Sequence, residues 1–167
     1  MTDTQMYRVF IDATPERVWE AITTPEMSRL YGYTGDVSYD LRPGGRYAHH
    51  ASEEMRSMGM PEVVVAGEVL ESDPPRRLVQ TWDPVWIEDE PAGTLTWEIE
   101  PTADGATRLT LTHDVTDRPQ TAAQIAGNPD PSGRGGGWPW VLSGIKTVLE
   151  TGRPMEQEVW ERQSSAS

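Results

Sequence analysis

The sequence predicts a single α+β domain in which a curved antiparallel β-sheet wraps round a long C-terminal helix. Three patterns predict it: a strand followed by two short helices, apolar and polar residues alternating over 35–111, and an amphipathic helix from Trp138. These elements can bury every apolar face only if the sheet curls round the last helix. We expect the domain to cover residues 1–152 of the 167, with a polar tail at 153–167.

The first strand is expected over residues 7–12, where Val9 and Ile11 share one face. The helix that follows should begin at Pro15, because Thr14 can cap it and proline suits the first helical position. It should end near Thr24, and a second short helix is expected over 26–30.

Six further strands are expected, separated by turn-forming residues at regular intervals. They lie over residues 36–41, 46–50, 63–71, 77–83, 94–100 and 107–115. In the fifth of them Leu95, Trp97 and Ile99 alternate with polar residues, which is typical of a strand with one buried face. One face of the sheet should therefore be apolar and the other exposed to water.

Residues 116–137 are rich in Pro, Gly, Asn and Asp, which predicts a long surface loop with one helical turn around 122–126. The longest helix should begin at Trp138 and end at Gly152, a residue suited to a C-terminal cap. Its apolar residues recur at helical spacing: Trp138, Val141, Leu142, Ile145, Val148 and Leu149.

Composition excludes several classes of function. The chain has 27 acidic and 14 basic residues, and its net charge of -13 repels phosphate backbones and anionic lipids. Neither nucleic acid nor a membrane is therefore expected as a partner. There is no cysteine, which excludes disulfides, thiolate zinc sites and cysteine nucleophiles. The first residues lack the basic flank and apolar run of a secretory signal, so we expect a soluble, cytoplasmic protein.

We expect no metal and no cofactor. His49 and His50 are adjacent in a strand and project to opposite sides, which disfavours a shared metal ion. The glycines at 135–137 are not followed by the Lys and Ser or Thr of a phosphate-binding loop. A Gly-x-Ser-x-Gly motif is also absent from the sequence.

A strongly bent sheet leaves space at its open end, and large rings at inward positions suit the wall of an apolar pocket. Taken alone, each such ring is more often an ordinary core residue, so this prediction rests on the curvature of the sheet. The expected ligand-binding residues are the inward positions of the strands and the last helix: Tyr39, Tyr47, His49, Trp82, Trp97, Leu111, His113, Trp138 and Leu142.

His113 is the candidate polar anchor and catalytic residue, because a neutral imidazole can act as a general base near neutral pH. Tyr47 is the second catalytic candidate. The alternative for His113 is a buried histidine that supports the fold.

Met55, Met58 and Met60 also leave two interpretations open. They either cover the mouth of a cavity or belong to a solvated loop.

A series of short motifs is more specific in its order and spacing than any one motif is alone. They lie at residues 13–19 (ATPERVW), 24–26, 42–45, 67–71, 74–78, 81–82, 111–113 and 137–138. Together they resemble the SRPBCC superfamily, and more narrowly its branch of homologues of the heat-shock-protein ATPase activator. The resemblance covers residues 7–152. It implies the helix-grip fold of START domains and the birch-pollen allergen group, with a hydrophobic cavity between sheet and last helix.

Members of the superfamily bind lipids or hormones, or act as polyketide aromatases and cyclases, so the resemblance leaves three hypotheses. The leading one is a protein that binds a small hydrophobic molecule of aromatic or polyketide-like character. The second is a cofactor-free cyclase, aromatase or dehydratase in which His113 moves protons, assisted by Tyr47 or His49. The third is a co-chaperone-like interaction module with an acidic exterior, and a homodimer is also left open.

Overall fold

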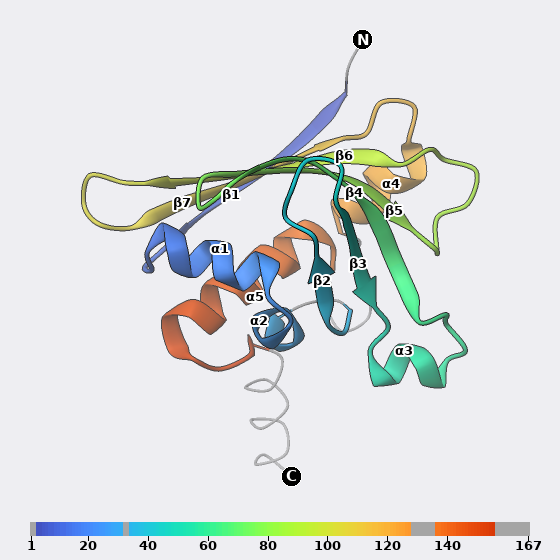
Figure 1. The fold of residues 1–167 in the computed structure, drawn as a ribbon, viewed down its shortest axis with the longest axis horizontal. Helices are drawn as coiled ribbons and strands as arrows, with labels where there is room; N and C mark the ends of the chain where they lie inside the picture. The colour runs from blue at the N-terminus through green and yellow to red at the C-terminus, as the bar shows by residue number, and fades with distance from the viewer. Residues whose placement is uncertain (1–2, 32–33, 128–135, 156–167) are drawn as a thin grey trace.

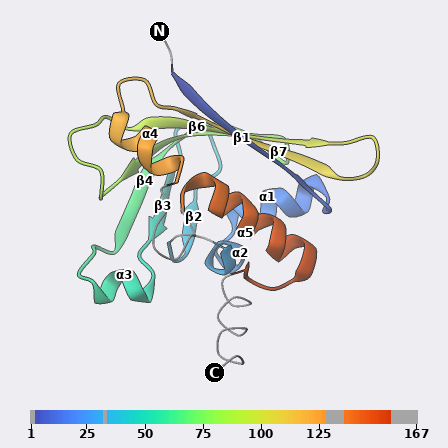
Figure 2. The same ribbon diagram turned by 180° about the vertical axis from the view of Figure 1, so that it is seen from behind.

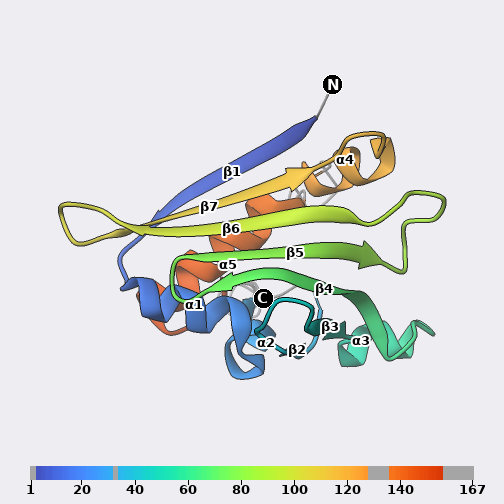
Figure 3. The ribbon, with the colours of Figure 1, turned by 45° about the horizontal axis from the view of Figure 1, so that its top comes forward.

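The computed structural model describes residues 3–31, 34–127 and 136–155. Within these ranges the chain forms a seven-stranded antiparallel sheet with the order β1-β7-β6-β5-β4-β3-β2. Figure 3 shows the central strands side by side. Strands β2 to β7 are a meander in which each strand pairs with the next, and β1 joins the sheet beside β7. The strands are β1 (Thr4–Ile11), β2 (Val37–Tyr39), β3 (Arg46–His50), β4 (Val63–Asp73), β5 (Arg77–Pro84), β6 (Gly93–Pro101) and β7 (Thr107–Asp114).

The described residues also form five helices. They are α1 (Pro15–Thr23), α2 (Pro25–Tyr31), α3 (Glu53–Ser57), α4 (Pro119–Ile125) and α5 (Gly137–Thr151). The sheet curves over α1, α2 and α5 (Figure 1), and the view from behind shows α5 crossing beneath it with α4 nearby (Figure 2). The predicted α+β helix-grip arrangement is therefore confirmed.

The predicted helix ends are also present. The Thr14 hydroxyl accepts a hydrogen bond from the Arg17 amide at 3.3 Å, and Pro15 opens α1. At the other end of the chain α5 stops at Gly152, whose φ of 77° lies in the left-handed region that glycine adopts readily. Both ends follow from local chemistry, which explains why the sequence could predict them.

Three segments differ from expectation. Strand β2 was expected to reach Leu41 but ends at Tyr39, and Leu41 is exposed. The chain turns at this point, because the Arg42 amide donates a hydrogen bond to the Asp40 carbonyl. Helix α4 begins earlier than the expected turn at 122–126. Helix α3, capped by Ser52, was not predicted as a helix. Residues 128–135 of the predicted loop and 156–167 of the predicted tail lie outside the described residues.

The core lies between the concave face of the sheet and α5. Many of its most buried large side chains come from β5, β6, β7 and α5, and they include Leu78, Leu95, Leu111 and Ile145, each at most 1% exposed. These residues anchor the strands that carry the aromatic rings described below. None of the helices in the described ranges is long and apolar enough to cross a membrane.

Candidate functional site

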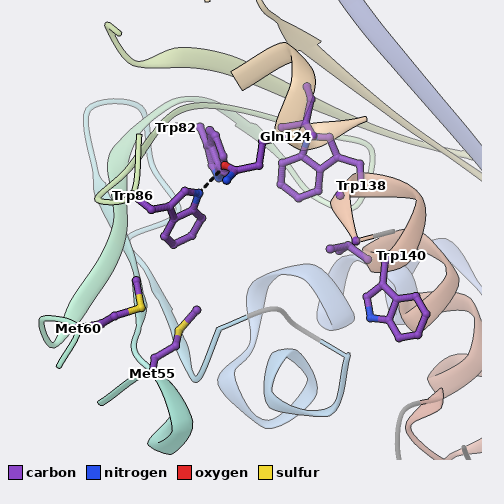
Figure 4. Close-up of a pocket in the computed structure, with 11 residues that line it drawn as sticks. Met55, Met60, Trp82, Trp86, Gln124, Trp138 and Trp140 are labelled. Atoms are coloured by element: carbon purple, nitrogen blue, oxygen red, sulfur yellow. Dashed lines mark hydrogen bonds between the residues drawn. The ribbon is translucent and has the colours of Figure 1, made fainter. Parts of the chain in front are cut away.

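A cavity of about 350 Å³ opens where the ends of β5, α4 and α5 come together, and we call it the outer cavity. Figure 4 shows Trp138 and Trp140 on one side of it, facing Trp86 and the two methionines on the other. Among the described residues, none with a charged side chain lines it. It is lined by Met55, Met60, Trp82, Trp86, Gln124, Ile125, Gly136, Gly137, Trp138, Trp140 and Val141.

Four tryptophans reach this cavity from two directions. Trp82 lies inward near the end of β5, and Trp86 follows shortly after the strand ends. Trp138 and Trp140 come from the first turn of α5. The rings of Trp82 and Trp138 are 5.8 Å apart and tilted, so together they form the floor of the cavity.

Hydrogen bonds hold α4 against the segment that follows β5. The Trp86 indole N–H donates to the Gln124 side-chain oxygen at 2.5 Å, across one end of the outer cavity (Figure 4). The Glu90 carboxylate accepts from the amide groups of Gln120 and Thr121, at 2.7 and 3.0 Å, in the first turn of α4. The position of Gln124 in the wall is therefore fixed by two independent contacts.

A second cavity of about 30 Å³ lies deeper between the sheet and the helices, and we call it the inner cavity. It shares Trp82, Trp138 and Val141 with the outer cavity, so the two are neighbours. Its wall mixes apolar and polar side chains: Ile22, Ser28, Tyr31, Thr34, Tyr39, His49, Gln80, Trp82, Leu95, Trp97, Trp138 and Val141.

The polar groups of the inner cavity are largely paired with one another. The Tyr39 hydroxyl donates to the Gln80 side-chain oxygen at 3.0 Å, and Gln80 is almost fully buried. The Thr34 hydroxyl lies 3.0 Å from Nδ1 of His49. Removal of the His49 ring from water, together with the neighbouring His50, lowers its pKa to about 4, so the ring is neutral at pH 7.

Tyr47 lines neither cavity and supports Tyr39 from behind. The two phenol rings are stacked with centroids 5.1 Å apart, and the Tyr47 hydroxyl donates to the Thr81 carbonyl. Gly67 makes room for this ring, since an added Cβ there would lie 2.5 Å from it. This geometry gives Tyr47 the role of a support for the inner wall.

His113 is fully buried behind Trp138 and is not among the residues that line either cavity. Its Nδ1 accepts the Trp138 indole N–H at 3.1 Å, and the Trp82 ring meets its ring edge to face at 5.1 Å. Because indole can only donate, the neutral imidazole carries its proton on Nε2. Burial, with a contribution from Arg118, lowers the pKa of His113 to about 4. The neutral His113 ring is thus the hydrogen-bond acceptor that orients the Trp138 indole.

The predicted ligand-binding residues therefore separate into three groups. Trp82 and Trp138 line both cavities, whereas Tyr39, His49 and Trp97 line the inner one. The others pack in the layer behind the walls: Tyr47, Leu111, His113 and Leu142.

Sequence reasoning missed several lining residues. Trp86 and Gln124 lie outside the predicted strands and last helix, and Trp140 falls off the apolar stripe of α5. Gln80 carried a usable signal, because a polar residue at an inward strand position needs a buried partner. Met55 and Met60 do line the outer cavity, while Met58 is 67% exposed.

Metal ligation has no support in the part of the chain that the structure describes. Within residues 3–31, 34–127 and 136–155 no three His, Asp or Glu side chains come together in a way that could hold a metal ion.

A family model described as "Activator of Hsp90 ATPase homolog 1-like protein" matches residues 12–150. Among curated proteins, none is significantly similar in sequence.

Solved structures of similar fold include CalU16 from Micromonospora echinospora, at 21% identity and a TM-score of 0.64, covering 98% of this chain and 85% of that one. DynU16, a protein in the dynemicin biosynthetic locus, is 24% identical with a TM-score of 0.67, covering 91% of this chain and 49% of its own. The Aha1 dimer from Colwellia psychrerythraea is 17% identical with a TM-score of 0.60, covering 90% and 98%. These likenesses establish the fold.

Proposed function

Since the chain belongs to the family of Activator of Hsp90 ATPase homolog 1-like proteins, we propose that it binds a small hydrophobic molecule in the outer cavity. The observation that carries the proposal is the wall itself, with four indole rings and two thioethers around about 350 Å³ and no charged side chain among the described residues that line it. This volume lies in the range of small-molecule sites, which are concave and mostly apolar. A ligand of aromatic character fits, because flat rings pack well between indoles.

The wall also suggests how the ligand is accommodated. The rings of Trp82 and Trp138 are held by contacts behind them, so they offer a fixed floor. Met55 and Met60 face this floor from the α3 side, and unbranched thioether side chains adapt to ligands of irregular outline. One rigid and one adaptable wall favour a flat skeleton with variable substituents.

The comparisons give limited further support. DynU16 lies in a biosynthetic locus, which favours a biosynthetic small molecule as ligand here. The Aha1 neighbour is a dimer, which favours self-association as an additional property of this chain. A cytoplasmic location, expected from the sequence, belongs to the same proposal.

The geometry supports the catalytic and the interaction hypotheses less than it supports the binding of a small molecule. His113 as an acid or base would need to reach a ligand, but Trp138 occupies its Nδ1 and its ring lines neither cavity. A co-chaperone-like role is supported by the family description and the acidic composition alone.

Titration with the neutral fluorophore N-phenyl-1-naphthylamine tests the proposal. We expect saturable enhancement of its fluorescence by the wild-type protein. Met60→Ala should weaken binding about fivefold, because apolar surface that the ligand covers is lost. Met58→Ala is the matched control, since this exposed side chain lies two residues away and is not in the wall. Absence of saturable binding, or equal effects of both substitutions, would contradict the proposal.

A further inference from the structure

Gln124 brings a carboxamide group to the wall of the outer cavity, whose other described side chains are rings, thioethers and aliphatic groups. The buried rings of Trp82 and Trp138 form the floor, whereas Gln124 is exposed, so water or a ligand reaches its side chain. Figure 4 shows this side chain extending from α4 toward Trp86 across one end of the cavity. A ligand in the outer cavity can therefore meet the carboxamide directly.

The Trp86 indole determines which end of this carboxamide is left for a ligand. An indole N–H can only donate, so the atom that it meets at 2.5 Å must be the Gln124 side-chain oxygen. The amide nitrogen Nε2 is bonded to the same carbon atom, and it donates to no residue within 3–31, 34–127 and 136–155. Its N–H donors consequently remain available at this end of the outer cavity.

Contacts at both ends of α4 hold Gln124 in place. The Glu90 carboxylate accepts hydrogen bonds from two backbone amides in the first turn of the helix, at 2.7 and 3.0 Å. At the last residue of α4, Gly137 comes so close to the Ile125 carbonyl that an added Cβ would lie 2.4 Å from its oxygen. A ligand thus meets a donor that is already positioned, and little conformational entropy is lost when the hydrogen bond forms.

The charges around the cavity favour an uncharged acceptor as the partner of these donors. No Lys or Arg is among the described residues that line the outer cavity. A carboxylate or phosphate that enters it would lose hydration without gaining a counter-charge, and the net charge of -13 repels anions in addition. A carbonyl oxygen avoids both costs and accepts a hydrogen bond from an amide N–H.

We propose that Gln124 determines specificity in the outer cavity: among flat hydrophobic molecules it selects those with an uncharged carbonyl oxygen, to which Nε2 donates a hydrogen bond. This rests on the proposed function, since the apolar body of the ligand packs against the surrounding rings. The selected class is thus an aromatic ketone or a related carbonyl compound.

Fluorene and 9-fluorenone form a matched pair of probes, because they share a skeleton and differ by one carbonyl oxygen. Their affinities are measured for the wild type and for Gln124→Glu, whose carboxylate can still accept from Trp86 but has no N–H to donate. The ratio of fluorenone to fluorene affinity should be about three- to tenfold lower in Gln124→Glu than in the wild type. Ala123→Glu is the control and should retain the wild-type ratio, because it adds the same charge at an exposed residue of α4 that lines neither cavity.

The outcomes separate the role of Gln124 from the proposed function. If fluorene binds but Gln124→Glu leaves the ratio unchanged, or Ala123→Glu lowers it equally, the role of Gln124 is overturned and binding in the outer cavity stands. If neither probe binds, both proposals fall. The infrared carbonyl band of bound fluorenone gives a second test: it should lie at lower wavenumber in the wild type than in Gln124→Glu, and equal positions in the two proteins would overturn the hydrogen bond.

Discussion

Trp138→Ala is expected to lower the free energy of unfolding by about 3–5 kcal/mol. The Trp138 side chain is 4% exposed and touches three other rings of the core, at centroid distances of 5.8 Å to Trp82, 6.1 Å to Trp97 and 6.1 Å to His113. Its removal opens one large void between the two cavities and leaves Nδ1 of His113 without its donor. Urea unfolding followed by circular dichroism measures the loss.

Two matched variants separate packing from hydrogen bonding in this prediction. Trp140→Ala changes the same residue type on the same helix, but this ring is only half-buried, so about 1 kcal/mol is expected. Trp138→Phe retains a ring and removes the N–H, which should cost about 1–3 kcal/mol by leaving the His113 acceptor unsatisfied. If Trp140→Ala were as destabilising as Trp138→Ala, the placement of Trp138 as the floor would be wrong.

The free energy of unfolding is expected to fall by about 2–3 kcal/mol between pH 7 and pH 4.5 because of His113 alone. Its pKa is about 4 in the folded protein and near the ordinary histidine value of 6.5 in the unfolded chain. The unfolded chain therefore binds more protons between these values, and stability decreases as pH falls through 6.5 toward 4. Above pH 6.5 both states are neutral, and the full stability is present.

His113→Asn is the control for this pH dependence. An asparagine side-chain oxygen can still accept the Trp138 N–H, but it does not titrate. Denaturant unfolding at several pH values should show a shallower decrease for the variant between pH 6.5 and 4.5. His49 also has a lowered pKa, so some dependence should remain. Equal slopes in both proteins would show that His113 is not buried in its neutral form.

Local chemistry explains how much of the fold the sequence could predict. Thr14 and Pro15 specify the start of α1, and the alternation of Leu95, Trp97 and Ile99 specifies β6, without reference to the rest of the chain. Helix α3 was missed because its five residues are too few for a helical period to show. Its cap, Ser52, and the acidic Glu53 and Glu54 in its first turn were the signals available.

The site was predicted less completely, because alternation indicates a face of the sheet and not what lies above it. His113 faces inward as expected, yet the space above it is filled by Trp138 rather than by a cavity. Trp86 and Gln124 meet only through the packing of α4 against the segment after β5. That contact joins residues 38 positions apart, which no local pattern encodes.

The indole N–H signals in two-dimensional ¹⁵N–¹H spectra, recorded during titration with N-phenyl-1-naphthylamine, test binding in the outer cavity most directly. Trp86 and Trp140 line the outer cavity and not the inner one, whereas Trp19 lines neither cavity. We predict large, saturable shifts for Trp86 and Trp140 and an unmoved signal for Trp19. Saturable shifts at Trp19 with Trp86 and Trp140 unmoved, or no saturable shift at all, would contradict the account.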